Sequence, residues 1–157
     1  LFENPGFNDR LSAYNNLIYY AKLYDTKEAI EDSLKLVGLF ERRHDQVGKY
    51  STGMKKKLGL ARALLHDPDL ILLDEPTTGL DPEAQKDFRD LVVKMSKEKE
   101  KTILLNTHNL DEAQKICTDI SILKDGHIMV SGKMNQILSK HKKRSLEDIY
   151  LEMVSKK

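Results

Sequence analysis

Two adjacent carboxylates, Asp74 and Glu75, follow the short apolar run 70–73, and Pro76 comes directly after them. A short, fully apolar strand is typical of a parallel sheet that is covered on both faces. Ligands of such sheets bind at the carboxyl ends of the strands. Because successive strand residues point to opposite sides, we expect Asp74 and Glu75 to reach different targets. One carboxylate could hold Mg²⁺ and the other could activate water. The alternative is a strand that ends in two solvated acids.

A candidate anion-binding turn lies upstream, where Ser51-Thr52-Gly53 opens a predicted helix. Free backbone N–H groups and the positive end of the helix dipole attract an anion at such a place. An ordinary serine cap gives the same pattern, so both interpretations stay open. The three lysines at 55–57 are expected to form a solvated face.

Two further polar positions fall near the same predicted sheet edge. Asp81-Pro82 follows a turn and predicts a helix start, with the aspartate as cap and the proline at the first helical position. His108 follows the predicted strand 102–106 directly and should emerge at the same carboxyl edge as Glu75. A plain cap and a structural histidine are the alternatives for Asp81 and His108.

Hydrophobic periodicity predicts the elements that position these residues. Strands are predicted at 70–74, 102–106, 119–123 and 127–130, and helices near 12–24, 26–37, 51–66, 81–97, 132–140 and 145–155, with a short helix after Asn109. Ser12, Thr26 and Asn109 are the expected caps, and Gly38 is a helix stop. Asp125-Gly126 predicts a two-residue hairpin. The alternation of strands and helices predicts an α/β fold with right-handed crossovers and a mostly parallel sheet.

The composition narrows the class of protein. The chain has 157 residues, of which 32% are charged, and its formal net charge of +1 gives no bulk attraction to nucleic acid or anionic lipid. The single cysteine, Cys117, rules out an internal disulfide and fits a reducing compartment. The apolar runs are too short to span a bilayer, and no signal segment opens the chain, which predicts a soluble, cytoplasmic protein. A start at Leu1 instead of methionine indicates a fragment.

The motifs from Ser51 to Pro82, taken in order, resemble the nucleotide-binding domain of ABC transporters, and the resemblance extends over nearly the whole chain. It implies a partial P-loop NTPase core, with a mostly parallel sheet and a helical subdomain. It divides the chain into a Q-loop region with the helical subdomain (1–49), a signature-helix and Walker B core (50–132) and C-terminal helices (133–157).

The resemblance also implies roles for single residues in ATP hydrolysis. By this resemblance, Ser51 and Gly53 of the signature motif contact the γ-phosphate of ATP that is bound mainly by a second domain. Asp74 is implied to organise Mg²⁺ through water, and Glu75 to be the general base. His108 is implied to steady the γ-phosphate, and Asp81 of the D-loop to communicate across the dimer.

The sequence departs from the family pattern at several places. Thr52 replaces a glycine, Met54 replaces a glutamine, and Glu3 stands where the Q-loop glutamine would bind near the nucleotide. The sequence contains no Gly-x-x-x-x-Gly-Lys-Ser/Thr, the motif that cradles phosphates. We therefore expect a fragment without its P-loop that neither binds ATP well nor hydrolyses it alone.

The implied partners are a membrane permease and a second nucleotide-binding domain, at the cytoplasmic face of the membrane, and no nucleic acid. Tyr50, Met54 and the segment 145–150 resemble those of drug- and peptide-exporting members. One alternative is a soluble ABC-type ATPase that acts on nucleic acid or ribosomes, for which the basic cluster 140–144 is the candidate contact. The other alternative is a non-catalytic docking module.

Overall fold

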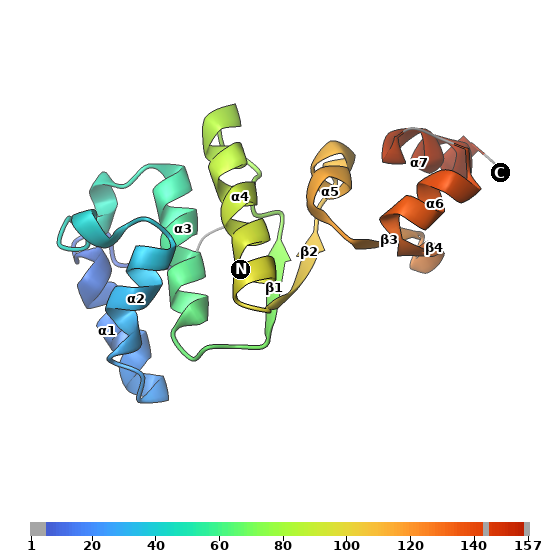
Figure 1. Ribbon diagram of the computed structural model, residues 1–157. Coiled ribbons are helices and arrows are strands. Elements are labelled where there is room, and N and C mark those ends of the chain that lie inside the picture. The colour runs from blue at the N-terminus through green and yellow to red at the C-terminus, as the bar shows by residue number, and fades with distance from the viewer. Residues whose placement is uncertain (1–5, 143–144, 156–157) are drawn as a thin grey trace. The chain divides into compact units, whose positions relative to one another are not determined.

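The computed structural model describes residues 6–142 and 145–155 (Figure 1). These residues form two compact units, Leu1–Asn106 and Thr107–Lys157. The strands make two separate two-stranded sheets, one in each unit. The division of the sequence at 49/50 and 132/133 stays a prediction.

The first unit begins with helices. Its elements are α1 (Ala13–Tyr24), α2 (Ala29–Leu36), the 3₁₀ turns η1 (Phe40–Arg42) and η2 (Val47–Lys49), and α3 (Thr52–Leu64). Ser12 caps α1, because its Oγ accepts a hydrogen bond from the Asn15 N–H at 3.1 Å. Gly38 ends the α2 region with a φ of +73°, as predicted. Thr26 is not the cap of α2: its main-chain carbonyl accepts from the Ala29 N–H at 3.0 Å, and Glu28 holds the N-cap position.

Helix α3 packs against α1, α2 and α4 (Pro82–Glu98) in this unit. Leu58 and Leu60 of α3, Leu17 of α1 and Leu34 of α2 are fully buried. Because this core is apolar and continuous, it fixes the position of the polar first turn of α3.

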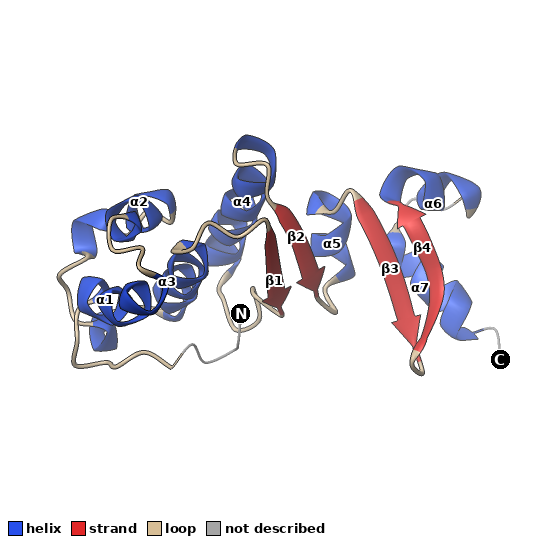
Figure 2. Ribbon diagram, turned by 90° about the horizontal axis from the view of Figure 1, so that it is seen from below, coloured by secondary structure: helices blue, strands red, loops and turns tan. Residues whose placement is uncertain are grey.

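The parallel sheet of the first unit consists of β1 (Leu70–Asp74) and β2 (Thr102–Asn106), which are joined through α4 (Figure 2). The two strands run in register, so that residue 70 pairs with 102 and residue 74 with 106. Ile71 and Leu73 are buried, as is Phe88 of α4. The two ends that carry polar residues therefore lie side by side.

The opposite face of this sheet is open. Leu70, Leu72 and Leu104 are 53%, 57% and 63% exposed. A sheet covered on both faces was expected from the apolar sequence of β1. Within the described residues the expectation is wrong, because more than half of the surface of each of these three leucines is exposed.

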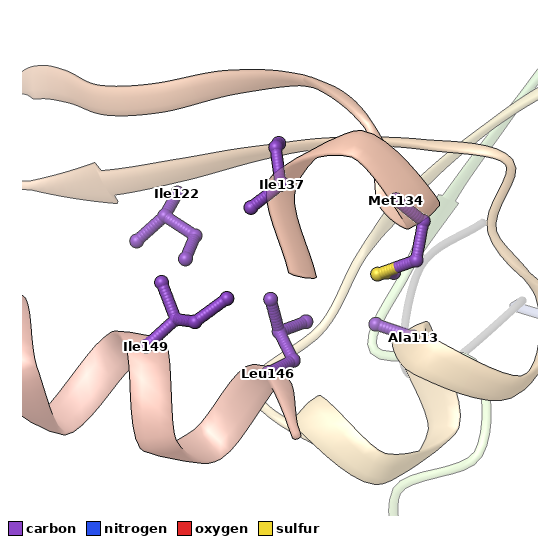
Figure 3. Packing of buried hydrophobic residues seen from close by; sticks show 6 residues of the cluster. All are labelled: Ala113, Ile122, Met134, Ile137, Leu146 and Ile149. Atoms are coloured by element: carbon purple, nitrogen blue, oxygen red, sulfur yellow. The ribbon is translucent and has the colours of Figure 1, made fainter. Parts of the chain in front are cut away.

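The second unit contains α5 (Leu110–Ile116), the antiparallel strands β3 (Asp119–Lys124) and β4 (His127–Lys133), and the helices α6 (Met134–Lys140) and α7 (Leu146–Ser155). Asn109 caps α5 by accepting from the Glu112 N–H at 3.0 Å. The turn between β3 and β4 has positive φ at Asp125 and Gly126, as the hairpin prediction requires. The core of the unit is an apolar cluster (Figure 3) formed by Ala113, Ile122, Met134, Ile137, Leu146 and Ile149.

The predicted α/β class is confirmed. A parallel β–α–β crossover and an antiparallel hairpin with flanking helices are both present. In the part of the chain that the structure describes, no helix is both long enough and apolar enough to cross a membrane.

Candidate active site

The carboxyl ends of β1 and β2 bring two polar side chains together. The Asn106 side-chain amide donates a hydrogen bond of 2.6 Å to Asp74 Oδ1. Both side chains are exposed on the face that also carries Leu72 and Leu104. Asn106 was not singled out in the sequence. The available signal was that Asn106 is the last residue of the second predicted strand, since the carboxyl ends of parallel strands lie at one edge of a sheet. Its pairing with Asp74 comes from the register.

Glu75 leaves the strand in an unusual backbone conformation. Its φ of +43° lies in the left-handed region, which is unfavourable for residues other than glycine, asparagine and aspartate. Its N–H donates to the Asn106 carbonyl at 2.9 Å, which extends the sheet by one bond. The Thr78 hydroxyl donates to Glu75 Oε2 at 3.0 Å. The Glu75 carboxylate is therefore turned out of the strand direction and held by its own turn.

Lys56 is buried under that turn. It is 6% exposed, and its ammonium group donates to the carbonyls of Thr78 at 2.6 Å and of Glu75 at 3.4 Å. The expected solvated face of lysines is therefore wrong for Lys56. Its two neighbours are partly buried, and Lys55 pairs with Asp9 and Lys57 with Asp87, two exposed acids. Every third or fourth residue of a buried helix faces the core, which is the signal that would have separated Lys56.

The first turn of α3 is a capped helix start. Ser51 Oγ accepts from the Met54 N–H at 3.2 Å, and Thr52 is exposed. Gly53 is buried, and a Cβ there would lie 3.3 Å from the Cβ of Ala84. The contact is tighter than side chains normally make, so Gly53 allows α3 and α4 to approach closely. Thr52, which stands where the family has glycine, is exposed, so its side chain has no such close contact with α4.

Tyr50 anchors the residue before this turn. Its hydroxyl donates to the Arg42 carbonyl at 2.7 Å. Burial raises the pKa of Tyr50, and the nearby Asp45 raises it further, while the Arg42 guanidinium opposes both. The entrance to α3 is thereby tied to η1.

Asp81 caps α4 as predicted. Its Oδ1 accepts from the Ala84 N–H at 2.9 Å, and Pro82 occupies the first helical position. Ala84 is also the residue that Gly53 approaches. The cap of α4 and the first turn of α3 therefore share one contact.

His108 is exposed, belongs to the second unit and lies in the short segment before α5, where the Thr107 hydroxyl accepts from the Asn109 N–H at 3.0 Å. Glu3 lies outside the described residues.

A bound Mg²⁺ fits the chemistry of Asp74. Among residues 6–142 and 145–155 there is no cluster of three or more His, Cys, Asp or Glu side chains that could hold a metal by itself. Mg²⁺ in nucleotide sites takes only one or two protein carboxylates, with water and phosphate oxygens as the other ligands. An exposed carboxylate at the end of a parallel strand meets that requirement.

The fold and this site define a partial α/β core of the P-loop NTPase class. The family model described as "ABC transporter" matches residues 1–78. The chain belongs to the ATP-binding proteins of ABC transporters.

Three known proteins illustrate the similarity. The ABC transporter ATP-binding protein NatA of Bacillus subtilis is 36% identical over 93% of this chain and 61% of NatA. The bacitracin transport ATP-binding protein BcrA of Bacillus licheniformis is 39% identical over 91% of this chain and 47% of BcrA. The structure of cbiO1 from Clostridium perfringens, part of the ABC transporter complex cbiONQ, matches with a TM-score of 0.79 and 26% identity over 90% of this chain and 59% of cbiO1. The chain thus spans about half of the length of these relatives.

Proposed function

We propose that this chain is the downstream part of an ATP-hydrolysing subunit that drives an ABC exporter. The observation that carries the proposal is the placement of Glu75. It follows the strand that ends in Asp74, and its carboxylate is oriented by the Thr78 hydroxyl at 3.0 Å. A carboxylate held beside a magnesium ligand is what the activation of an attacking water requires.

Asp74 would hold Mg²⁺ through water, and the Asn106 amide would orient its carboxylate. The ion supplies charge neutralisation on the β- and γ-phosphates when it is bound. The side-chain amide at 2.6 Å occupies one oxygen of Asp74 and leaves the other available. Asn106 is thus a positioning residue in this proposal.

Glu75 would accept a proton from the attacking water. A positioned general base contributes about 10²–10⁴-fold to the rate of such a step. Its backbone N–H is bonded to the Asn106 carbonyl, so that the base and the magnesium ligand share one support. His108 would steady the γ-phosphate, and Glu3 would take the Q-loop position near the ion.

Ser51 and Gly53 would contact the γ-phosphate of a nucleotide that is bound mainly by a second nucleotide-binding domain. The backbone N–H groups of the first turn of α3 are suited to this role, because they lie at the positive end of a 13-residue helix. Asp81 would carry the signal across the dimer, since its helix packs against Gly53.

The partners in this proposal are a second nucleotide-binding domain and a membrane permease, and the protein would work at the cytoplasmic face of the membrane. In this proposal, the helices α1 and α2 would form the helical subdomain that touches the permease. A relative from Mycobacterium tuberculosis, named fluoroquinolones export ATP-binding protein and 40% identical over 82% of this chain, supports export as the direction. The substrate would be a drug-like or peptide compound.

The 157 residues alone would neither bind ATP well nor hydrolyse it, because no Gly-x-x-x-x-Gly-Lys-Ser/Thr is present to cradle the phosphates. The activity would belong to a longer protein that supplies this loop. The coding sequence upstream of Leu1 is the first thing to read. A strand followed by that motif supports the proposal, whereas a start codon without it favours a docking module.

The functional test uses the product of the complete open reading frame. Glu75→Gln should lower the turnover of Mg-ATP by about 10²–10⁴-fold while ATP still binds. Glu83→Gln is the matched control, because Glu83 is an exposed acid in the first turn of α4 and should leave turnover unchanged. Equal turnover in the wild type and Glu75→Gln would overturn the proposal. Salt-dependent binding of nucleic acid would favour the soluble ABC-type ATPase instead.

A further inference from the structure

We propose that Lys56 is a positioning residue that ties the signature helix α3 to the turn that carries Glu75. The inference rests on the proposed function, in which Glu75 is the general base. It adds a residue for which the sequence predicted only a solvated surface position.

The contact geometry is that of a clamp on one turn. The Lys56 ammonium donates to the main-chain carbonyls of Thr78 at 2.6 Å and Glu75 at 3.4 Å. These two residues are the ends of the turn that the Thr78 N–H closes onto the Glu75 carbonyl at 3.3 Å. Lys56 thus bonds to both ends of the segment 75–78 and fixes its orientation relative to α3.

Burial makes this clamp strong. Lys56 is 6% exposed, and hydrogen bonds from a charged donor are stronger than those between neutral groups. A buried ammonium group is costly unless oxygens surround it, so these carbonyls are needed to keep Lys56 in place. The clamp and the turn therefore stabilise each other.

The backbone of Glu75 explains why the turn needs a clamp. A glutamate at a φ of +43° persists only where its surroundings determine its conformation. The N–H of Glu75 is held by Asn106 on β2, and its carbonyl is held by Lys56 on α3. The two supports come from different elements, so a shift of α3 would re-aim the Glu75 carboxylate.

This connection has a direction in the proposed mechanism. Lys56 lies about one and a half helical turns after Ser51. In the proposal Ser51 and Gly53 read the nucleotide that a second domain holds. Their contact would position α3, and Lys56 would pass that position to Glu75 of the same chain. Hydrolysis at one nucleotide would thereby depend on occupancy of the other.

The test compares three variants of the product of the complete open reading frame. Lys56→Met keeps an unbranched side chain that is one atom shorter than lysine and removes its donors. Lys56→Gln restores amide donors on a side chain of the same length as methionine. Lys57→Met is the matched control, because it removes a lysine of the same helix that pairs with the exposed Asp87 and makes no bond to the turn 75–78.

Lys56→Met should lower kcat for Mg-ATP by about tenfold or more, with KM changed by less than about twofold. Lys56→Gln should recover part of kcat, and Lys57→Met should match the wild type. Wild-type kcat in Lys56→Met would overturn the proposal. The proposal would also be overturned if kcat in Lys56→Met and Lys56→Gln falls only in proportion to the fraction of protein that remains folded.

Amide hydrogen exchange gives a second measurement that needs no activity. In Lys56→Met, or in Lys56→Gln if the first variant does not fold, the amides of Glu75 and Thr78 should exchange faster while those of α1 stay unchanged. Unchanged exchange at both amides would overturn the clamp. If the wild type hydrolyses no ATP, the proposed function fails, but the exchange experiment still decides whether Lys56 holds the turn.

Discussion

The Asn106 amide donates a 2.6 Å hydrogen bond to the Asp74 carboxylate, and the two residues are register partners at the ends of β2 and β1. The same asparagine accepts the Glu75 N–H through its carbonyl at 2.9 Å. One residue therefore supports both members of the carboxylate pair. Because Asn106 is exposed, its replacement should change the electrostatic interaction with Asp74 and leave the packing of the core unchanged.

Asn106→Asp should lower the free energy of unfolding by about 1 kcal/mol at pH 7, because two carboxylates would face each other where a donor faced an acceptor. The repulsion exists only while both carboxylates are charged, so the penalty is present at pH 7 and lost near pH 3. Urea unfolding at the two pH values measures it. Thr102→Asp is the control, since its register partner is Leu70. An equal loss at both pH values would contradict the electrostatic reason.

Asp81→Ala should cost about 1 kcal/mol of stability, because it removes the cap bond to the Ala84 N–H. Asp81→Asn keeps an acceptor oxygen and should restore most of the stability. Thermal unfolding of the three proteins gives the comparison. If the product of the complete open reading frame with Asp81→Asn is stable but slow in ATP turnover, the proposed dimer role of Asp81 is separated from its role as a cap. If Asp81→Ala unfolds at the wild-type temperature, the cap is unimportant.

Tyr50 should make stability fall as pH rises above about 10. Burial raises the pKa of Tyr50 in the folded chain, so the folded state keeps a proton that the unfolded state loses first. The effect is absent below the unfolded pKa and grows above it. Tyr50→Phe carries no titrating hydroxyl and should be less stable at pH 8, where the 2.7 Å bond to the Arg42 carbonyl is lost. The gap between the two proteins should narrow toward pH 11 in urea titrations. A gap that is constant with pH would contradict the shift.

Leu72→Lys combined with Leu104→Glu should reduce self-association of the isolated chain. Both leucines are more than half exposed and are register partners, so the open sheet face offers contiguous apolar surface. Sedimentation velocity over a range of concentrations measures the effect. Ile71→Lys is the contrast, because Ile71 is buried and its replacement should unfold the first unit. A wild-type chain that stays a monodisperse monomer would contradict the prediction.

The sequence predicted most elements because their signals are local. The strands at 70–74 and 102–106 are found with the predicted bounds, and the caps Ser12, Asp81 and Asn109 make the expected bonds. Thr26 failed as a cap, since a turn formed by its backbone carbonyl precedes α2 and the helix starts later.

The contacts that support the site were harder to predict, because they depend on which elements meet. Helical spacing could have placed Lys56 on the core face of α3, but its bonds to the turn 75–78 follow only from the packing of α3 under that turn. The open face of the sheet was also missed. An apolar strand indicates that both faces of its sheet can be covered. It does not indicate which elements cover them.

The left-handed backbone of Glu75 has a consequence for how this position tolerates change. Glycine adopts a φ of +43° without the steric penalty of a Cβ, so stability alone would favour glycine or asparagine there. A glutamate keeps the chain less stable than it could be. With Glu75 as the proposed general base, selection for activity and selection for stability would oppose each other at position 75. Screens for thermostable variants of the product of the complete open reading frame should then repeatedly recover replacements that no longer turn over ATP.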